Sequence, residues 1–514
     1  MDAILIMQKN SLEKKTLNIL IVSPEMFPFA KVGGMADVVA SLAAALRRRG
    51  HDVRVVMPRY SEIDGEKLGA TVCLEPMGVW MGTGEEWCSV YQAVSPGGLP
   101  VYMIEHRRYF DRAGLYHDAA MNDYDDNPRR FGFLCRAALQ LCKDLRFMPD
   151  IVHANDWQTA LVSAYLKIWH WNDPRLSKVA SLLTVHNAAY QGCYPKAHYE
   201  YLGLGWDNFT DDKFESYGKI NLLKGGIHYS DMIVAVSPSF GREIREPHGG
   251  FGLAPYLAGR DADLEGIVNG IDYAVWNPFV DPKIPAHFSA KDLSGKKQCK
   301  RALQEAFGLK KRATIPVIGC IGRFVEQKGF GLVMRMIERV LRDMAVQFVI
   351  LGDGNRQLEE YFGALPGRFP GRAGSYIGFD DGRAHLVNSG SDFFLMPSQW
   401  EPCGLNQMYA QRYGTLPIVR AVGGLNDTVS QYDEKTGNGT GFKFEDFSEN
   451  ALYYTIGWAI STWYDRPAHI KKMIAAAMSR DFSWDASAAA YETAYRKAMA
   501  NRKKYDERFK KYYW

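Results

Sequence analysis

The sequence alternates short apolar segments with amphipathic helical segments, and the alternation occurs twice along the chain. In the first half, apolar runs of strand length each lead into a polar loop, at 17–22, 53–57, 150–154, 181–185 and 232–236. In the second half the pattern returns at 317–321, 345–351, 392–396 and 417–422. Strands that alternate with helices form parallel sheets covered on both faces. The sequence therefore predicts an α/β protein with two doubly wound domains, separated by the polar stretch 281–300.

Composition excludes several classes of protein. The chain has 514 residues with 62 Lys and Arg against 58 Asp and Glu, a formal net charge of +4 that disfavours a nucleic-acid or membrane-surface binder. Its eight cysteines form no Cys-x-x-Cys pair and are too sparse for a disulfide framework. Residues 1–17 do not read as a signal peptide, and no segment has the length of a membrane span. We expect a soluble, cytoplasmic protein; the sequence does not predict its oligomeric state.

Ligands of such sheets bind beyond the carboxyl ends of the strands, so the loops after strands are the ones to read. The first is Lys31-Val32-Gly33-Gly34, whose glycines and helix start suit an anion. A tight strand–helix turn explains the same residues. Two further loops, 153–157 and 184–192, place His, Asn, Asp and Gln at strand ends, which suits hydrogen bonds to a polyhydroxylated ligand. A histidine satisfied in the core is the alternative for each.

The second half offers two charged loops. In 322–329, Arg323 and Lys328 flank a helix start and can clamp a diphosphate, although a surface salt bridge is the alternative. In 397–407, Glu401 precedes a glycine that opens a helix, which places one acid beside free N–H donors. A glutamate placed by the helix dipole alone is the other interpretation.

The ordered set of motifs resembles a known family. It comprises Lys-Val-Gly-Gly, Asp-Trp-Gln, Thr-Val-His-Asn, Val-Asn-Gly-Ile-Asp (268–272), Gly-Arg-Phe, Glu-Pro-Cys-Gly-Leu and Gly-Gly-Leu-Asn-Asp-Thr-Val (423–429). From about Asn18 to Ser483 the chain closely resembles the bacterial and plant glycogen and starch synthases that use ADP-glucose. The resemblance implies two Rossmann-like domains facing across a deep cleft, the GT-B arrangement. We expect domains at 18–264, completed by a C-terminal helix at 488–514, and at 265–487.

The resemblance also implies roles for individual residues. Nucleotide binding falls to Lys31, Gly33, Gly34 and Asp37 in the first half, and to Arg323, Lys328, Gly404, Leu405 and the adenine-stacking Phe379 in the second. The transferred glucose would be contacted by His186, Asp156, Asn187 and Tyr116. Glu401 is the expected essential carboxylate, with Cys403 beside the sugar-phosphate. The implied reaction transfers glucose from ADP-glucose to an α-1,4-glucan with retention of configuration, without a metal or pyridoxal phosphate cofactor.

The sequence departs from the family pattern at some positions, and it leaves alternative functions to be tested. Asn155 stands where a histidine is often found, and Phe379 where many relatives have tyrosine. The alternatives are a glycosyltransferase with another donor, such as UDP-glucose, or another acceptor, and a non-catalytic glucan-binding protein of the same fold. A glucan phosphorylase would need a lysine motif for pyridoxal phosphate that we do not find. The sequence does not distinguish glycogen from starch as product.

Overall fold

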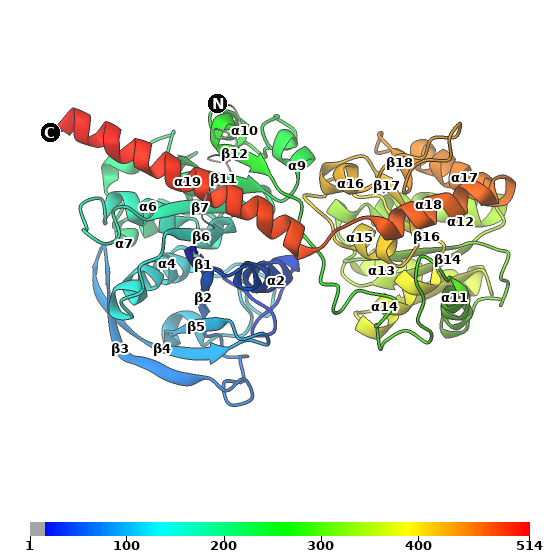
Figure 1. Ribbon diagram of the computed structural model, residues 1–514, viewed down its shortest axis with the longest axis horizontal. Helices are drawn as coiled ribbons and strands as arrows, with labels where there is room; N and C mark the ends of the chain where they lie inside the picture. Colours follow the sequence, from blue (N-terminus) through cyan, green and yellow to red (C-terminus); the bar gives the residue numbers. More distant parts are fainter. Residues whose placement is uncertain (1–15, 514) are drawn as a thin grey trace, which may run out of the picture. The chain divides into compact units, whose positions relative to one another are not determined.

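The computed structural model describes residues 16–513, with side chains for residues 16–507. The chain divides into two compact units (Figure 1). Unit 1 comprises Met1–Ala235, Ile244–Glu265 and Ser487–Trp514, and unit 2 comprises Val236–Glu243 and Gly266–Ala486. The short segment Val236–Glu243 packs with unit 2, whereas the range expected from the sequence for the first domain ran through it without a break. The expected absence of a signal peptide concerns residues that lie mostly outside the described part.

The sheet of unit 1 has the order β12-β11-β7-β6-β1-β2-β5-β4-β3, and Figure 1 shows these strands following one another from β3 and β4 at the bottom to β12 at the top. The bounds are β1 (Asn18–Val22), β2 (Asp52–Pro58), β3 (Thr71–Met81), β4 (Gly84–Val94), β5 (Pro100–Glu105), β6 (Ile151–Asn155), β7 (Ala180–Val185), β11 (Met232–Ala235) and β12 (Leu264–Gly266). From β5 to β11 all neighbours are parallel, whereas β3 and β4 form an antiparallel hairpin at the edge. The alternation of apolar runs did not predict that hairpin.

Unit 2 contains a fully parallel sheet of order β15-β14-β13-β16-β17-β18. Its strands are β13 (Val317–Ile321), β14 (Gln347–Gly352), β15 (Ala373–Ile377), β16 (Phe393–Met396), β17 (Leu416–Arg420) and β18 (Phe442–Phe444). In chain order this is 3-2-1-4-5-6, the doubly wound order, and the six parallel strands β5-β2-β1-β6-β7-β11 of unit 1 repeat it. The predicted fold class, an α/β protein with two doubly wound domains, is confirmed.

Helices alternate with these strands. In unit 1 they are α2 (Gly34–Arg48), α3 (Arg107–Phe110), α4 (Asn127–Asp144), α5 (Asp156–Thr159), α6 (Leu161–Ile168), α7 (Tyr199–Leu202), α8 (Leu222–Tyr229) and α10 (Ala254–Ala258). In unit 2 they are α9 (Pro238–Glu243), α11 (Ser294–Ala306), α12 (Phe330–Asp343), α13 (Arg356–Arg368), α14 (Asp381–Gly390), α15 (Asn406–Arg412), α16 (Gly423–Thr428), α17 (Glu449–Asp465) and α18 (Pro467–Ser479). On α12, Val333, Ile337 and Val340 recur at helical spacing and are fully buried, which explains why this amphipathic segment docks on the sheet.

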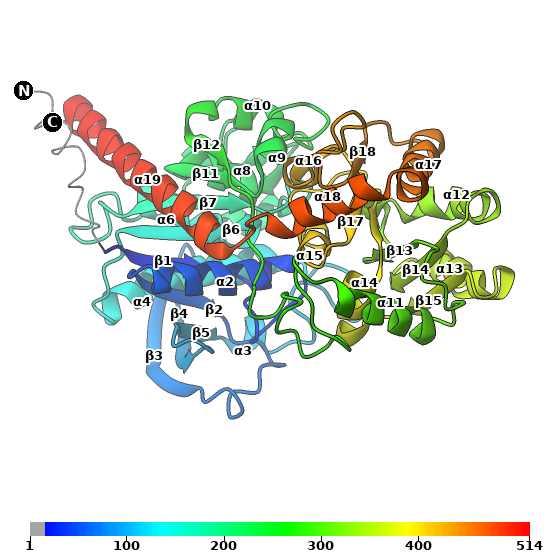
Figure 2. The ribbon, with the colours of Figure 1, turned by 45° about the vertical axis from the view of Figure 1, so that its right-hand side comes forward.

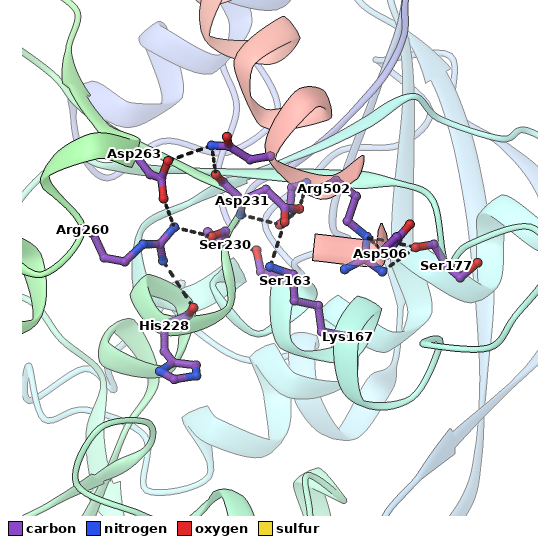
Figure 3. Close-up of polar contacts among 12 residues, drawn as sticks. Ser163, Lys167, Ser177, His228, Ser230, Asp231, Arg260, Asp263, Arg502 and Asp506 are labelled. Atoms are coloured by element: carbon purple, nitrogen blue, oxygen red, sulfur yellow. Dashed lines mark hydrogen bonds and ion pairs between the residues drawn. The ribbon is translucent and has the colours of Figure 1, made fainter. Parts of the chain in front are cut away.

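The C-terminal helix α19 (Trp484–Tyr513) packs with unit 1 from Ser487 onward, as the sequence predicted. Figures 1 and 2 both draw it beside β6, β7 and β11. In the first half of α19 the Tyr495 hydroxyl lies 2.9 Å from Nδ1 of His153 on β6. At its far end Arg502 donates to the Ser177 carbonyl, beside the network in which Lys167 pairs with Asp231 at 2.8 Å (Figure 3). The helix is therefore an integral layer of unit 1.

The expectations about membrane spans and cysteines concern the helices and the thiol groups. None of the helices within residues 16–513 combines the length and the apolar character that a membrane span requires. All eight cysteines are free thiols.

Candidate active site

The predicted loops leave each sheet where its strand order reverses. In unit 1 this point lies between β1 and β6, which are adjacent and parallel, and in unit 2 it lies between β13 and β16. Ligands of doubly wound sheets bind beyond the strands at such a point. The Lys31–Gly34 turn and Asp156 follow β1 and β6, whereas Arg323 and Glu401 follow β13 and β16. Topology thus gives each unit one candidate ligand-binding edge.

The glycine turn after β1 surrounds a buried carboxylate. Val32 and Gly33 both donate their backbone N–H groups to Oε2 of Glu25, with Gly33 at 3.2 Å. Glu25 is buried, and burial raises its pKa although the two N–H groups act in the opposite direction. These donors are therefore already occupied. The Val32 and Gly33 N–H groups do bind an anion, as one of the two explanations for this turn predicts, but that anion is the Glu25 carboxylate of the same chain.

Lys31 and Asp37, both predicted near the nucleotide, contact each other. The Lys31 ammonium lies 2.7 Å from a carboxylate oxygen of Asp37, which sits in the first turn of α2. Both side chains remain substantially exposed, so the pair is worth little to stability and either group is free to exchange its partner for a ligand.

Asp156 holds the loop after β7. Its Oδ1 accepts the backbone N–H of His186 at 2.6 Å, and the N–H of Asn187 also donates to the carboxylate. Asp156 has φ +53°, a left-handed conformation that costs free energy for a residue with a Cβ and is typical of functional sites. Burial raises the pKa of Asp156 to about 7 and lowers the pKa of His186 to about 3. The three predicted residues Asp156, His186 and Asn187 form one contiguous group.

Tyr116 joins this group from a separate segment. Its ring is buried, and burial together with the nearby charges of Glu25 and Asp156 raises its pKa well above 10. Its hydroxyl is buried and has no hydrogen-bond partner among the described residues. An orphaned buried hydroxyl is costly, so a ligand hydroxyl is a natural partner for it.

In unit 2, Lys328 and Glu401 form a bidentate ion pair. The Lys328 ammonium lies 2.9 and 2.7 Å from the two oxygens of Glu401, and Ser398 donates to Oε2 at 2.9 Å. Glu401 is buried whereas Lys328 is partly exposed. An ammonium carries three N–H donors, so Lys328 keeps one for an anion while it holds the carboxylate.

Glycines permit the close packing around Glu401. A Cβ on Gly423 would lie 1.9 Å from the Glu401 carbonyl oxygen, and one on Gly424 would lie 2.2 Å from that of Cys403. The N–H of Gly424 donates to the Glu401 carbonyl. Gly404 adopts φ +73° just before Leu405, the N-cap residue of α15. Burial raises the pKa of Cys403 to about 12, so its thiol is neutral. The Gly-Gly motif therefore supports the loop that carries the acid.

Arg323 and Phe379 stand apart from that ion pair. Arg323 is exposed, and its guanidinium has no hydrogen bond or ion pair with any residue that the structure describes. Phe379 follows β15 and is 78% exposed, which is unusual for a phenylalanine. Because β15 and β13 are separated by β14, their loops start roughly 10 Å apart. The structure does not bring these two residues into contact with Glu401.

Within residues 16–513 no group of three or more His, Cys, Asp or Glu side chains could hold a metal ion. The expectation of a metal-free site stays a prediction.

Comparison with known proteins assigns both halves of the chain. Residues 18–259 match the family model described as starch synthase catalytic domain, and residues 303–477 match glycosyl transferases group 1. Glycogen synthase 1 of Geobacter metallireducens is 46% identical over 95% of this chain and 97% of its own length. The chain belongs to the glycogen synthase family. Another family member, glycogen synthase of Treponema denticola, is 43% identical over 94% of this chain and 99% of its own length.

A solved structure of this family superposes on nearly the whole chain. It is the catalytic domain of starch synthase IV from Arabidopsis thaliana bound to ADP and acarbose, with a TM-score of 0.86 and 33% identity over 95% of this chain and all of that chain. The resemblance that the motifs predicted is thereby confirmed.

The sequence did not identify Glu25 and Ser398 as candidate site residues of this glycogen synthase family member. Glu25 lies seven residues before Val32, whose N–H it accepts, and Ser398 lies three residues before Glu401. A polar residue directly after an apolar strand was the signal available for both, since Ser398 follows β16 closely and Glu25 follows β1.

Proposed function

We propose that this protein is a retaining glucosyltransferase that moves glucose from ADP-glucose to the 4-hydroxyl at the non-reducing end of an α-1,4-glucan. The observation that carries the proposal is the match to glycogen synthases over nearly the full length of both chains. ADP as the nucleotide is supported by the Arabidopsis structure, which was solved with ADP. The strand-end loops of both units are compatible with it, because all charged residues implied by the resemblance are present.

The chemistry requires ADP to leave an oxocarbenium-like sugar. Arg323, with its unpartnered guanidinium, and the remaining donor of Lys328 stabilise the charge that develops on the diphosphate, a contribution that is often the largest in such reactions. The Glu401 carboxylate, held by Lys328 and Ser398, lies ready to stabilise positive charge on the sugar. His186, Asn187 and the orphaned Tyr116 hydroxyl supply hydrogen bonds to glucose hydroxyls.

A donor comparison tests the proposal. Glycogen is incubated with either ADP-glucose or UDP-glucose, and incorporated glucose is measured for wild type, Lys31→Ala and Glu401→Ala. We expect wild type to prefer ADP-glucose and both variants to lose transfer. Lys311→Ala is the matched control, because Lys311 forms a similarly exposed ion pair with Glu305 at 2.8 Å away from the strand-end loops. Strong preference for UDP-glucose would contradict the donor assignment, and no transfer from either donor would favour a glucan-binding protein.

A further inference from the structure

Asn155 ends β6 and contacts the ring of His186, which follows the neighbouring strand β7. Its Oδ1 lies 3.0 Å from Nε2 of His186. The two strands are parallel, and Asn155 is in register with Thr184, two residues before the histidine. Asn155 is buried, so its amide has few possible partners. The contact therefore decides how the imidazole can use its nitrogens.

A second hydrogen bond fixes which way the amide points. Nδ2 of Asn155 donates to the backbone carbonyl of Val22, the last residue of β1, at 3.1 Å. A carbonyl oxygen only accepts, so the NH₂ group must face Val22 and the amide oxygen must face His186. The backbone is held as well, since the N–H of Asn155 donates to Oγ1 of Thr159 at 2.6 Å and that hydroxyl donates back to its carbonyl at 2.9 Å.

An amide oxygen also only accepts, so the imidazole must donate from Nε2. We propose that Asn155 is a positioning residue that locks His186 in the Nε2–H tautomer, which leaves Nδ1 as an unprotonated acceptor for a sugar hydroxyl. This inference rests on the proposed function, in which His186 contacts the transferred glucose. Burial lowers the pKa of His186 to about 3, which is consistent with a neutral ring that carries one proton.

The surroundings of the ring leave Nδ1 available. No described residue hydrogen-bonds to Nδ1, while the backbone N–H of His186 is held by Asp156. Earlier on β6, Nε2 of His153 lies 2.7 Å from Oγ1 of Thr184 on β7, and its Nδ1 lies 2.9 Å from the Tyr495 hydroxyl of α19. Side-chain hydrogen bonds therefore also connect β6, which carries Asn155, with β7, which precedes His186. The imidazole is therefore fixed in position, orientation and proton placement before substrate binds.

The test reads the tautomer directly. The protein is labelled with ¹⁵N-histidine, the His186 signal is assigned by its loss in His186→Gln, and nitrogen shifts are recorded for wild type, Asn155→Leu and Asn155→Asp. Wild type should show a protonated Nε2 and a bare Nδ1. In Asn155→Leu we expect mixed tautomers and a fall in kcat of about 10-fold to 100-fold with a smaller change in KM for ADP-glucose.

Asn155→Asp provides the conservative rescue. A carboxylate still accepts from Nε2, so the tautomer should be retained, but the added charge favours a second proton on the ring. Its activity should recover at alkaline pH and fall on acidification, a profile that wild type lacks. Thr159→Val is the control, because it removes hydrogen bonds to the Asn155 backbone and leaves the amide in place; it should keep the wild-type tautomer.

Either of two results overturns the proposal: a protonated Nδ1 in wild type, or an unchanged tautomer in Asn155→Leu. If Asn155→Leu fails to fold, the spectra of wild type and Asn155→Asp still decide. The tautomer is read without turnover, so a wild-type protein that shows the Nε2–H form yet transfers no glucose would contradict the proposed function and leave the assignment intact.

Discussion

In unit 1 the buried carboxylates after the strands face backbone N–H groups, whereas in unit 2 the buried carboxylate after β16 faces an ammonium. Glu25 accepts from Val32 and Gly33, and Asp156 accepts from His186. Glu401 instead takes both oxygens to Lys328. Six parallel strands of unit 1 have the same order as the sheet of unit 2, so this difference lies in the loops that follow the strands.

The difference separates two kinds of ligand. Buried carboxylates held by N–H dipoles add no positive charge to the loops around His186, which suits the hydroxyls of a neutral sugar; the Lys31 ammonium of unit 1 is paired with Asp37. Unit 2 leaves the exposed Arg323 and one donor of Lys328 uncommitted, which suits a diphosphate. A net charge of +4 over the whole chain conceals this local contrast.

The largest expected effect comes from breaking the ion pair of unit 2. Glu401→Gln removes the negative charge and keeps an acceptor for Ser398, so we expect kcat to fall by about 100-fold to 1,000-fold, as when one charge-stabilising group is lost elsewhere. ADP affinity, measured by calorimetry, should be retained, because Lys328 loses a competing anion.

Lys328→Met tests the same pair from the other side. It leaves Glu401 buried without its cation, so this variant should lose both ADP affinity and stability. The double variant Lys328→Met/Glu401→Gln should be more stable than Lys328→Met alone. Additive effects of the two changes, or normal turnover in Glu401→Gln, would show that the pair does not act as a unit.

An intermediate effect is expected from Asp156→Asn in unit 1. The loss of a carboxylate that positions His186 should lower kcat by roughly 100-fold. Stability should change in the opposite direction, because asparagine also tolerates φ +53° and does not ionise when buried.

The pH dependence of the difference in stability between Asp156→Asn and wild type tests whether ionisation of Asp156 causes it. Burial raises the folded-state pKa of Asp156 from 3.8 to about 7, so its contribution to stability is present in full below about pH 4 and is lost as the pH rises to about 7. The shift of about three units corresponds to roughly 4 kcal/mol. Thermal denaturation of both proteins from pH 4 to pH 8 should therefore show the variant gaining on wild type as pH increases. A constant difference would mean that Asp156 does not titrate in this range.

The sequence predicted nine of the twelve strands of the two parallel runs and the loops that follow them, because apolar runs and glycine turns are local signals. Most candidate residues therefore lie in loops that follow the carboxyl ends of the strands. The sequence did not predict β5, β15 or β18. It did not predict that Lys31 would pair with Asp37 or that Glu25 would occupy the Val32 and Gly33 N–H groups. Nor did it predict the β3–β4 hairpin, whose strands are only two residues apart but carry many exposed positions in place of a continuous apolar run. Partner choice is set by packing in three dimensions, which spacing along the chain does not encode.

The smallest expected effect belongs to Phe379, whose side chain in unit 2 is largely exposed. If its ring stacks on adenine, Phe379→Ala should weaken ADP binding by roughly 10-fold, since base–aromatic stacking contributes about 1–3 kcal/mol. Phe379→Tyr keeps the stacking face and should bind within about twofold of wild type. Tyr454→Ala on α17 is the matched control, because Tyr454 is 66% exposed on the same unit and follows no strand end of the parallel sheet. Equal losses in Phe379→Ala and Tyr454→Ala would indicate a general surface effect. Loss confined to Phe379→Ala would extend the nucleotide-binding edge from the β13 and β16 loops to that of β15.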